Sequence, residues 1–586
     1  SKGAVMLIDV QSNDNDVISG TAYVGDYFAE RITDEHQSGD NWTFEWTAGT
    51  DPLVIRVETD EGFDPILDLV DEFGDPVTAD AFEGDGQYYQ LTFNSLATGN
   101  YTVAVHSSTY DKSGNYVLSI NPADPSGMPQ LVSVGAEGIH VTTSTTAGSL
   151  TITSTQYGNS QFSNNSSTGM FALVGGAVTF RNVRVGDNGG FGAYIDNCLT
   201  VSGKCTGVGG FSTSGYTEFV YNRYDGLSVH TTGAINMVDV DAAGNGGFGA
   251  YLSNDSGRAP VSITSIMLRP NWYNGFNNNG SFGLQVTSSG AISLNRVMAN
   301  NNGTFGLHAS NTTALLPAAI TISNGQFMEN YNGSGAYVDS HGLITFNTVT
   351  ANDNTVLGAH IKNDYAGFIN GVTILKSIFN SNSYGLTVAT RGNILANGLS
   401  ASDNDFAGVQ MTNDSTGAVG TITLLNTLGL NGFYNNGTNG LTLFSNRAIN
   451  VTGISLGWNG YGAEESGDES LGFLVVSRQA GITLRNAWLE YNAQTGVVAD
   501  AYGAVLFDRV YSYNNGWADP DGTWDDGAQI FSGYGNVTLS NSAFAGNNGS
   551  GYGVNINMPV YRLFLINTTA YANNRNGSGS PETYVY

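Results

Sequence analysis

The stretch GAYVDSHGLITFNTVTANDNTVLGAHI, residues 335–361, decides the fold. It holds one complete unit of 23 residues, which starts at Gly335, and the beginning of the next unit at Gly358. Each unit opens with glycine and a short apolar strand. A second strand, a third short strand and a corner rich in Asn, Asp and Gly follow, and no part of the unit has a helical period.

The glycine-led phrase recurs 16 times, at Gly138, Gly169, Gly192, Gly226, Gly249, Gly283, Gly306, Gly335, Gly358, Gly385, Gly408, Gly440, Gly472, Gly496, Gly527 and Gly553. A unit this small cannot bury its own apolar face, so successive units must stack on one another. Three short strands per unit predict a right-handed parallel β-helix of about 16 rungs over residues 138–586. A leucine-rich repeat is excluded because its L-x-x-L-x-L-x-x-N frame is absent.

Asparagine follows the second strand in several units. We expect these side chains to point inward at one corner and to bond to one another and to the corner backbone. The residues concerned are Asn182, Asn347, Asn397, Asn486, Asn541 and Asn567.

The first part of the chain has a different pattern. Residues 1–125 contain 23 Asp and Glu but only 4 Lys and Arg, and short strands of alternating polarity fill residues 17–121. The segments Trp42 to Phe44, Asp64 to Gly74, Gly99 to Val105 and Gly114 to Ile120 resemble the bacterial pre-peptidase C-terminal domain family. That resemblance implies an antiparallel β-sandwich appended to a secreted protein and says little about chemistry. The predicted fold is therefore all-β, with an N-terminal strand in residues 1–16, the sandwich in 17–121, a linker or cap in 122–137 and the β-helix in 138–586.

Composition restricts the partners. The net charge of −30, with only 20 Lys and Arg, argues against nucleic acid. No segment is apolar over the roughly 20 residues that a membrane helix needs. The chain begins at Ser1, which favours a processed, secreted product found outside the cell or on its surface.

Cys198 and Cys205 lie seven residues apart, and a local disulfide is favoured over a metal site in an exported protein.

Three groups of residues are candidate functional sites. The loop around Trp517 offers oxygen ligands that suit calcium, and a solvated turn or a contact with a sugar or a partner are the alternatives. The acidic residues of the loop are Asp519, Asp521, Asp525 and Asp526.

The outward-facing residues of the first strand form a stripe along the repeats, which is either ordinary surface or a groove for a glycan or a partner. The stripe includes Tyr194, Tyr251, His308, Tyr337 and His360. The chain ends are candidates for strand exchange between copies, which would build a homopolymer; they contain Ala4, Val5, Met6, Leu7, Ile8, Val10, Tyr584 and Tyr586. The first strand could instead join the chain's own sandwich.

Right-handed β-helices also include polysaccharide lyases and hydrolases, so catalytic residues must be sought. The repeats contain Lys only at Lys204, Lys362 and Lys376, and no acid pair stands out. The sequence therefore favours a non-enzymatic structural or adhesive protein of the cell surface. An extracellular polysaccharide lyase or glycoside hydrolase, or a glycan-binding protein without catalysis, is the alternative.

Overall fold

The structure is a computed structural model of the chain. The residues that it describes are 4–8, 11–13, 19–21, 27–32, 40–48, 52–59, 65–84, 88–107, 114–120, 138–142, 148–154, 160–165, 167–198, 200–201, 204–205, 207–254, 257–266, 274–461, 470–518, 526–547, 553–557, 562–571 and 573.

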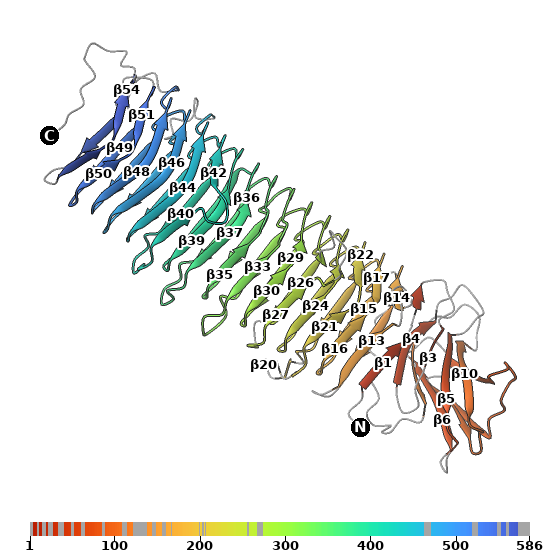
Figure 1. Cartoon of the computed structure of the whole chain (residues 1–586). Helices are drawn as coiled ribbons and strands as arrows, with labels where there is room; N and C mark the ends of the chain where they lie inside the picture. The colour runs from red at the N-terminus through yellow and green to blue at the C-terminus, as the bar shows by residue number, and fades with distance from the viewer. Residues whose placement is uncertain are drawn as a thin grey trace. The chain divides into compact units, whose positions relative to one another are not determined.

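The predicted fold class is confirmed. The described residues contain no helix, and hence none that could cross a membrane. Antiparallel sheets near the N-terminus are followed by rows of parallel strands (Figure 1). The chain divides into two compact units, residues 1–291 and 292–586, which are described separately.

The sandwich belongs to the first unit. In one sheet, β10 (Gly99–Ser107) lies between β5 (Asp40–Trp46) and β7 (Pro65–Asp71), and β3 (Ser19–Thr21) pairs with β5. The other sheet has the order β4 (Tyr27–Ile32), β11 (Gly114–Ile120), β6 (Leu53–Thr59), β9 (Tyr88–Phe93), β8 (Ala81–Gly84). The buried Trp42 donates its indole N–H to the Tyr116 hydroxyl at 2.8 Å and so links the two sheets.

The remaining strands of the first unit form three parallel rows, one for each strand of the repeat. The first-strand row contains β12 (Ile139–Thr142), β15 (Met170–Leu173), β18 (Ala193–Asp196), β23 (Leu227–His230), β26 (Ala250–Asn254) and β29 (Leu284–Ser288). The second-strand row contains β13 (Ser149–Thr153), β16 (Val178–Arg181), β21 (Phe211–Ser214), β24 (Ile235–Val238) and β27 (Val261–Thr264). The third-strand row contains β14 (Ser160–Ser163), β17 (Val183–Gly186), β22 (Thr217–Val220), β25 (Val240–Asp241) and β28 (Asn274–Gly275). A hairpin of β19 (Thr200–Val201) and β20 (Lys204–Cys205) is inserted after β18.

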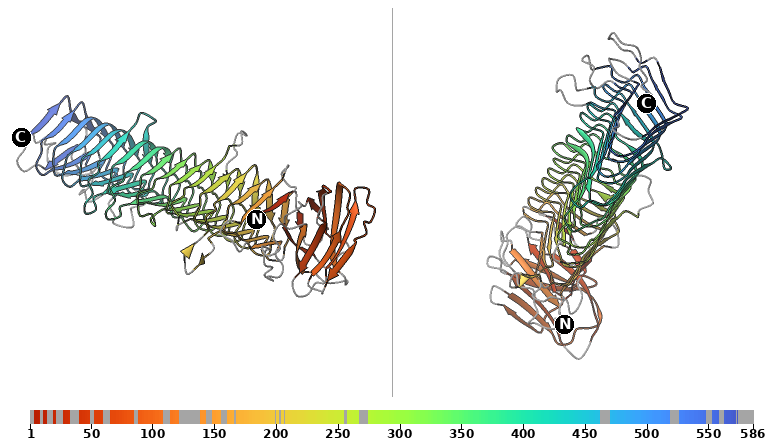
Figure 2. Two further views of the ribbon diagram at one scale, coloured as in Figure 1. Left: turned by 90° about the horizontal axis from the view of Figure 1, so that it is seen from below. Right: turned by 90° about the vertical axis from the view of Figure 1, so that its left-hand side faces the viewer.

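The second unit repeats the same plan, and successive turns are visible in Figure 2. Its first-strand row contains β32 (Leu307–Ser310), β34 (Ala336–Asp339), β36 (Leu357–Asn363), β38 (Tyr384–Thr390), β40 (Val409–Asn413), β43 (Leu441–Ser445), β45 (Phe473–Ser477), β47 (Val497–Ala501), β49 (Ala528–Ser532) and β52 (Val554–Asn557). Its second-strand row contains β30 (Ile292–Asn295), β33 (Ile320–Ser323), β35 (Ile344–Asn347), β37 (Val372–Ile378), β39 (Ile394–Ser400), β41 (Ile422–Leu425), β44 (Ile449–Gly457), β46 (Ile482–Glu490), β48 (Val505–Tyr513), β50 (Val537–Ser540) and β53 (Leu563–Ile566). The third strand is separate in β31 (Val297–Met298), β42 (Asn431–Tyr434), β51 (Ala543–Ala545) and β54 (Thr569–Tyr571), and is fused to the second in several other rungs.

Apolar ladders form the core of each coil. In the second unit, Ile320, Ile344 and Val372 are in register on neighbouring strands, and each is at most 1% exposed. Because side chains alternate between the two faces of a strand, the residues between them point outward.

A buried asparagine ladder runs along one corner, and it consists of different residues from those predicted. Each side-chain amide donates to the amide oxygen of the next rung, as Asn330 does to Asn354 at 2.8 Å. The ladder contains Asn165, Asn188, Asn222, Asn245 and Asn279 in the first unit, and Asn302, Asn330, Asn354, Asn382, Asn404, Asn436, Asn459, Asn492, Asn515, Asn547 and Asn573 in the second.

The predicted set lies at another corner and is not a buried ladder. Asn182, Asn486, Asn541 and Asn567 have φ near +50°, which Asn tolerates better than other residues with a β-carbon. Asn486 and Asn541 are exposed. These four positions therefore serve the turn of the backbone. Asn347 is the last residue of β35, and Asn397 is buried and donates to Thr427.

The asparagine ladder explains the glycine-led phrase. A β-carbon at Gly335 would lie 2.6 Å from the carbonyl oxygens of Gly358 and Phe327, and 2.8 Å from the Asn354 amide nitrogen. Such a separation is far below van der Waals contact. Glycine is needed here for the close approach of backbone to the ladder.

The first strand of the chain covers the start of the coil. β1 (Ala4–Ile8) pairs in parallel with β13, from Ala4 opposite Ser149 to Ile8 opposite Thr153, and β2 (Gln11–Asn13) pairs with β14. The same strand touches the sandwich through one antiparallel pair, Ile8 with Thr21 of β3.

Candidate functional site

The third-strand row of the first unit carries a cluster of charged residues. Arg184, Glu218 and Asp241 occupy equivalent outward positions of β17, β22 and β25 and are in register with one another. The Nε atom of Arg184 lies 3.4 Å from Glu218 Oε2, and the two side chains are 24% and 16% exposed. The stacking of rungs thus brings together side chains that are 34 and 23 residues apart in sequence.

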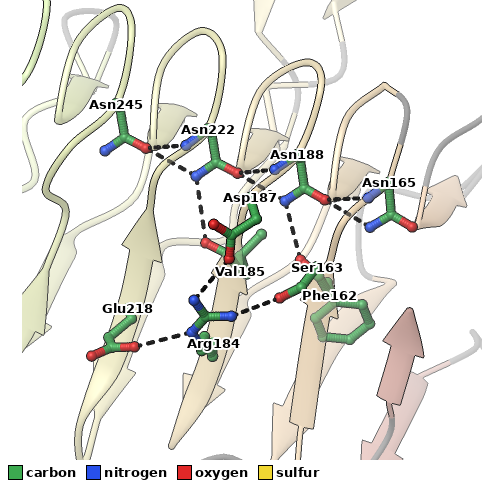
Figure 3. Close-up of polar contacts among 10 residues, drawn as sticks. All are labelled: Phe162, Ser163, Asn165, Arg184, Val185, Asp187, Asn188, Glu218, Asn222 and Asn245. Atoms are coloured by element: carbon green, nitrogen blue, oxygen red, sulfur yellow. Dashed lines mark hydrogen bonds and ion pairs between the residues drawn. The ribbon is translucent and has the colours of Figure 1, made fainter. Parts of the chain in front are cut away.

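Arg184 is fixed by further contacts. Figure 3 shows its guanidinium reaching Ser163 Oγ at 3.0 Å and Asp187 Oδ2 at 2.9 Å, beside the asparagine ladder. A guanidinium held by several acceptors is a rigid partner for a carboxylate. The guanidinium thus holds the Glu218 side chain in place.

Asp241 has the opposite environment. Burial is the main cause that raises the pKa of the Asp241 carboxyl to about 6, and the charge of Glu218 adds to this effect. The Tyr216 hydroxyl lies 3.3 Å from Asp241 Oδ2 and opposes the increase in pKa. The cluster therefore pairs a carboxyl group held by arginine with one whose pKa is raised to about 6.

Such a pair can perform general acid and nucleophilic chemistry. Neighbouring strands lie about 4.8 Å apart, close to the roughly 5–5.5 Å between the two carboxyl groups of retaining glycosidases. Two titratable groups whose surroundings separate their pKa values are the usual sign of an acid and a base with different roles.

This cluster was not among the candidate sites predicted from the sequence. Arg184 and Asp241 stand between apolar neighbours in the third strand, and Glu218 stands between Thr217 and Phe219. The segments are VRV at 183–185, TEF at 217–219 and VDA at 240–242. Aligning the units on that strand, instead of on the glycine-led first strand, would have placed them in one column.

The predicted stripe lies on the first-strand row. In the first unit, Tyr194 stacks on Phe171 with ring centroids 5.2 Å apart, and Phe171 stacks on His140 at 4.7 Å. Tyr251 contacts Phe248 at 6.0 Å. This part of the stripe is aromatic and lacks a carboxylate pair.

In the second unit the stripe brings His308, Tyr337 and His360 together on β32, β34 and β36. Tyr337 lies between the two histidines, with centroids 5.3 Å from His308 and 4.8 Å from His360. Burial lowers the pKa of both imidazoles, against an opposing effect of Asp339, and it raises the pKa of Tyr337. His360 Nδ1 is 2.7 Å from the Thr387 hydroxyl. Two neutral imidazoles therefore flank a phenol at neutral pH.

The predicted calcium loop falls mostly outside the described residues. This holds for Asp519, Asp521 and Asp525, whereas Asp526 is described and is 3% exposed. Among the described residues, one group of three potential ligands is close enough to hold a metal ion, Cys198, Cys205 and His230. The two cysteines are joined in a disulfide with Cα atoms 4.6 Å apart, so they are not thiolate ligands in this state. Calcium binding stays a prediction.

The predicted assembly residues are only partly placed. Ala4 to Ile8 pair with β13 of the same chain, while Val10, Tyr584 and Tyr586 lie outside the described residues. Exchange of this strand between copies stays a prediction.

No protein-family model matches the chain, and none of the curated proteins matches it. Similar solved structures exist for both parts. The pre-peptidase C-terminal domain of a collagenase from Bacillus anthracis is 16% identical, covers 18% of this chain and 99% of its own, and has a TM-score of 0.16. The A-module of the mannuronan C-5 epimerase AlgE6 from Azotobacter vinelandii is 13% identical over 68% of this chain and 91% of its own, with a TM-score of 0.26. The catalytic domain of a GH87 alpha-1,3-glucanase, solved with tetrasaccharides, is 11% identical over 96% of this chain and 100% of its own, with a TM-score of 0.21.

These similarities support the expected pre-peptidase C-terminal and β-helix folds. The prediction of a non-enzymatic protein is not supported by them: the β-helix structures found are an epimerase module and a glucanase. At such low identity the likeness concerns the fold alone. The chemistry has to be argued from this chain's own residues.

Proposed function

We propose that the chain is an extracellular polysaccharide-acting enzyme that hydrolyses glycosidic bonds at Glu218 and Asp241. The observation that carries the proposal is the contrast within the pair: Glu218 is held by Arg184 at 3.4 Å, whereas the pKa of Asp241 is raised to about 6. Its disulfide suits an oxidising location outside the cytoplasm.

The reaction follows from these protonation states. Asp241 protonates the glycosidic oxygen while the Glu218 carboxylate attacks the anomeric carbon, so the carbon–oxygen bond breaks and a glycosyl ester forms. Asp241, now ionised, removes a proton from water as that water cleaves the ester. The anomeric configuration is retained, and both carboxyl groups return to their starting states.

A screen for released reducing ends, on a panel of neutral and acidic polysaccharides, tests the proposal. Glu218→Gln and Asp241→Asn are each expected to lower kcat at least 1000-fold on the substrate that is found. Asp187→Asn is the matched control, because Asp187 also contacts Arg184, at 2.9 Å, but lies outside the pair. Full activity of both pair variants would overturn the proposal.

The ladder of His308, Tyr337 and His360 supports a second candidate, β-elimination from a uronic acid residue. An imidazole of lowered pKa can accept the proton next to the carboxylate, and the Tyr337 phenol can protonate the leaving oxygen. Lys362 lies on the same strand as His360, and its ammonium group lies 5.1 Å from the Tyr365 ring centroid, so it offers a charge for the substrate carboxylate. Ultraviolet absorbance of an unsaturated product, lost in His360→Gln but kept in Glu218→Gln, would identify this reaction.

A further inference from the structure

Each turn of the coil contains one residue of positive φ directly before a ladder asparagine. This corner position is a left-handed backbone conformation, which Gly, Asn and Asp adopt most readily. Most rungs obey the rule, with Asn164, Asp187, Gly244, Asn278, Asn301, Asp353, Asp403, Asn435, Asn514 and Gly546 at this place. Ser381 and Glu329 also occur there, and so does one aromatic residue of the first unit, Tyr221 with φ of 58°.

Two consecutive rungs of the second unit break the rule with large aromatic residues. Trp458 precedes Asn459 with φ of 58°, and Tyr491 precedes Asn492 with φ of 53°. Neither ring contributes to the core, because Trp458 is 44% exposed and Tyr491 is 37% exposed. A bulky side chain in this conformation is unfavourable for folding, so the observation points to a role at the surface.

The two rings stack on one another and line a pocket. Their centroids are 4.6 Å apart and their planes differ by 10°. Tyr461 and Trp517 complete the aromatic lining together with Asn514, and the pocket has a volume of about 420 Å³. The Trp517 indole N–H donates to the Tyr491 carbonyl at 3.1 Å, which fixes the orientation of the second tryptophan.

Among the residues that the structure describes, those that line the pocket carry no formal charge, although the chain has a net charge of −30. An uncharged aromatic pocket disfavours phosphate, uronate and cationic ligands, which need an opposite charge in place of their water shell. Aromatic faces bind the apolar C–H face of a pyranose ring, and the tyrosine hydroxyls and the Asn514 amide can bind its hydroxyl rim.

We infer that Trp458, Tyr461, Tyr491 and Trp517 form a binding site for a neutral saccharide chain. Its described lining residues are four aromatic side chains and one asparagine, which suit holding a glycan by its ring faces and hydroxyl groups. The inference goes beyond the hydrolysis proposed at Glu218 and Asp241, and it does not depend on that reaction.

Affinity electrophoresis and calorimetry of the full chain test the site, with the Glu218→Gln variant used as background so that no probe is cleaved. The probes are neutral glucans, mannan and xylan, a polyuronate, and a proline-rich peptide, since aromatic grooves also bind such peptides. Trp458→Asn is expected to weaken binding of a neutral polysaccharide at least tenfold. Asn occupies the same corner in other rungs, for example at Asn435, so the backbone is kept.

Trp488→Thr is the matched control. Trp488 is 43% exposed, a fraction similar to that of Trp458, but it is not one of the residues that line the pocket. The Trp488→Thr variant should bind the neutral polysaccharide as tightly as the parent does. Undiminished binding by Trp458→Asn, absence of binding to any neutral polysaccharide, or preference for the peptide or the polyuronate would each overturn the inference. Loss of hydrolysis in Glu218→Gln with unchanged glycan binding would leave it intact.

Discussion

Asp241 shows how one side chain can oppose folding and serve chemistry. Its folded pKa of about 6 lies above the roughly 3.9 of an unfolded aspartate. Below about pH 3 both states are protonated and Asp241 has no effect on stability. Between pH 4 and 6 the unfolded chain loses its proton first, so the free energy of unfolding falls, and above pH 6 the full loss is reached.

Asp241→Asn is therefore expected to stabilise the protein at pH 8 by up to about 3 kcal/mol, and to leave stability at about pH 3 unchanged. Urea unfolding of the variant and the parent at both pH values measures the effect. Asp187→Asn should show no comparable gain, because Asp187 is 40% exposed at its side chain. Equal stability of Asp241→Asn and the parent at pH 8 would show that the carboxyl is not perturbed.

A substitution in the asparagine ladder is expected to destabilise the protein, in contrast to Asp241→Asn. Asn354 accepts from the Asn330 amide and donates to the Phe327 carbonyl and to Asn382, all in the interior. Asn354→Ala leaves several buried polar groups without partners, and we expect it to lower the free energy of unfolding by roughly 3–5 kcal/mol. Asn332→Ala provides the control. Because Asn332 is exposed, this substitution should change the free energy of unfolding by less than about 0.5 kcal/mol. Similar urea midpoints for the two variants would contradict this account.

Among the elements, the strands were the part of the fold that could be predicted. The glycine-led phrase placed the first strand correctly because Gly335 and its equivalents face the ladder, so their identity is constrained by contact. The third strand has a less distinct sequence pattern, since it is only two residues long in β25 and β28 and is fused to the second strand in β46 and β48. Arg184, Glu218 and Asp241 stand on this row, which is why their proximity was not foreseen.

Gly335→Ala tests that reading of the phrase. The added β-carbon would meet backbone oxygen at 2.6 Å on two sides, and we expect a loss of about 2 kcal/mol or more. Gly533→Ala is the control, because its nearest neighbour would be 3.5 Å away. Thermal unfolding of both variants measures the difference, and equal melting temperatures would argue against a packing role for the glycine.

On the scale of the whole molecule, β1 protects the open edge of β13. An unpaired edge and an uncovered coil end favour association with other chains. Deletion of residues 1–16 is expected to convert the protein into oligomers, seen by light scattering, and a synthetic peptide of residues 1–16 should reverse this. A deletion variant that stays monomeric with an unchanged melting temperature would contradict the role of β1.

The pH dependence of kcat/KM for polysaccharide hydrolysis tests the central claim most directly. Since Asp241 must be protonated to act, kcat/KM should fall above an apparent pKa of about 6. Asp241→Asn should remove both the activity and this limb, and Asp187→Asn should keep both. A limb that persists at the same pH in Asp241→Asn, with activity close to that of the parent, would contradict catalysis at this pair.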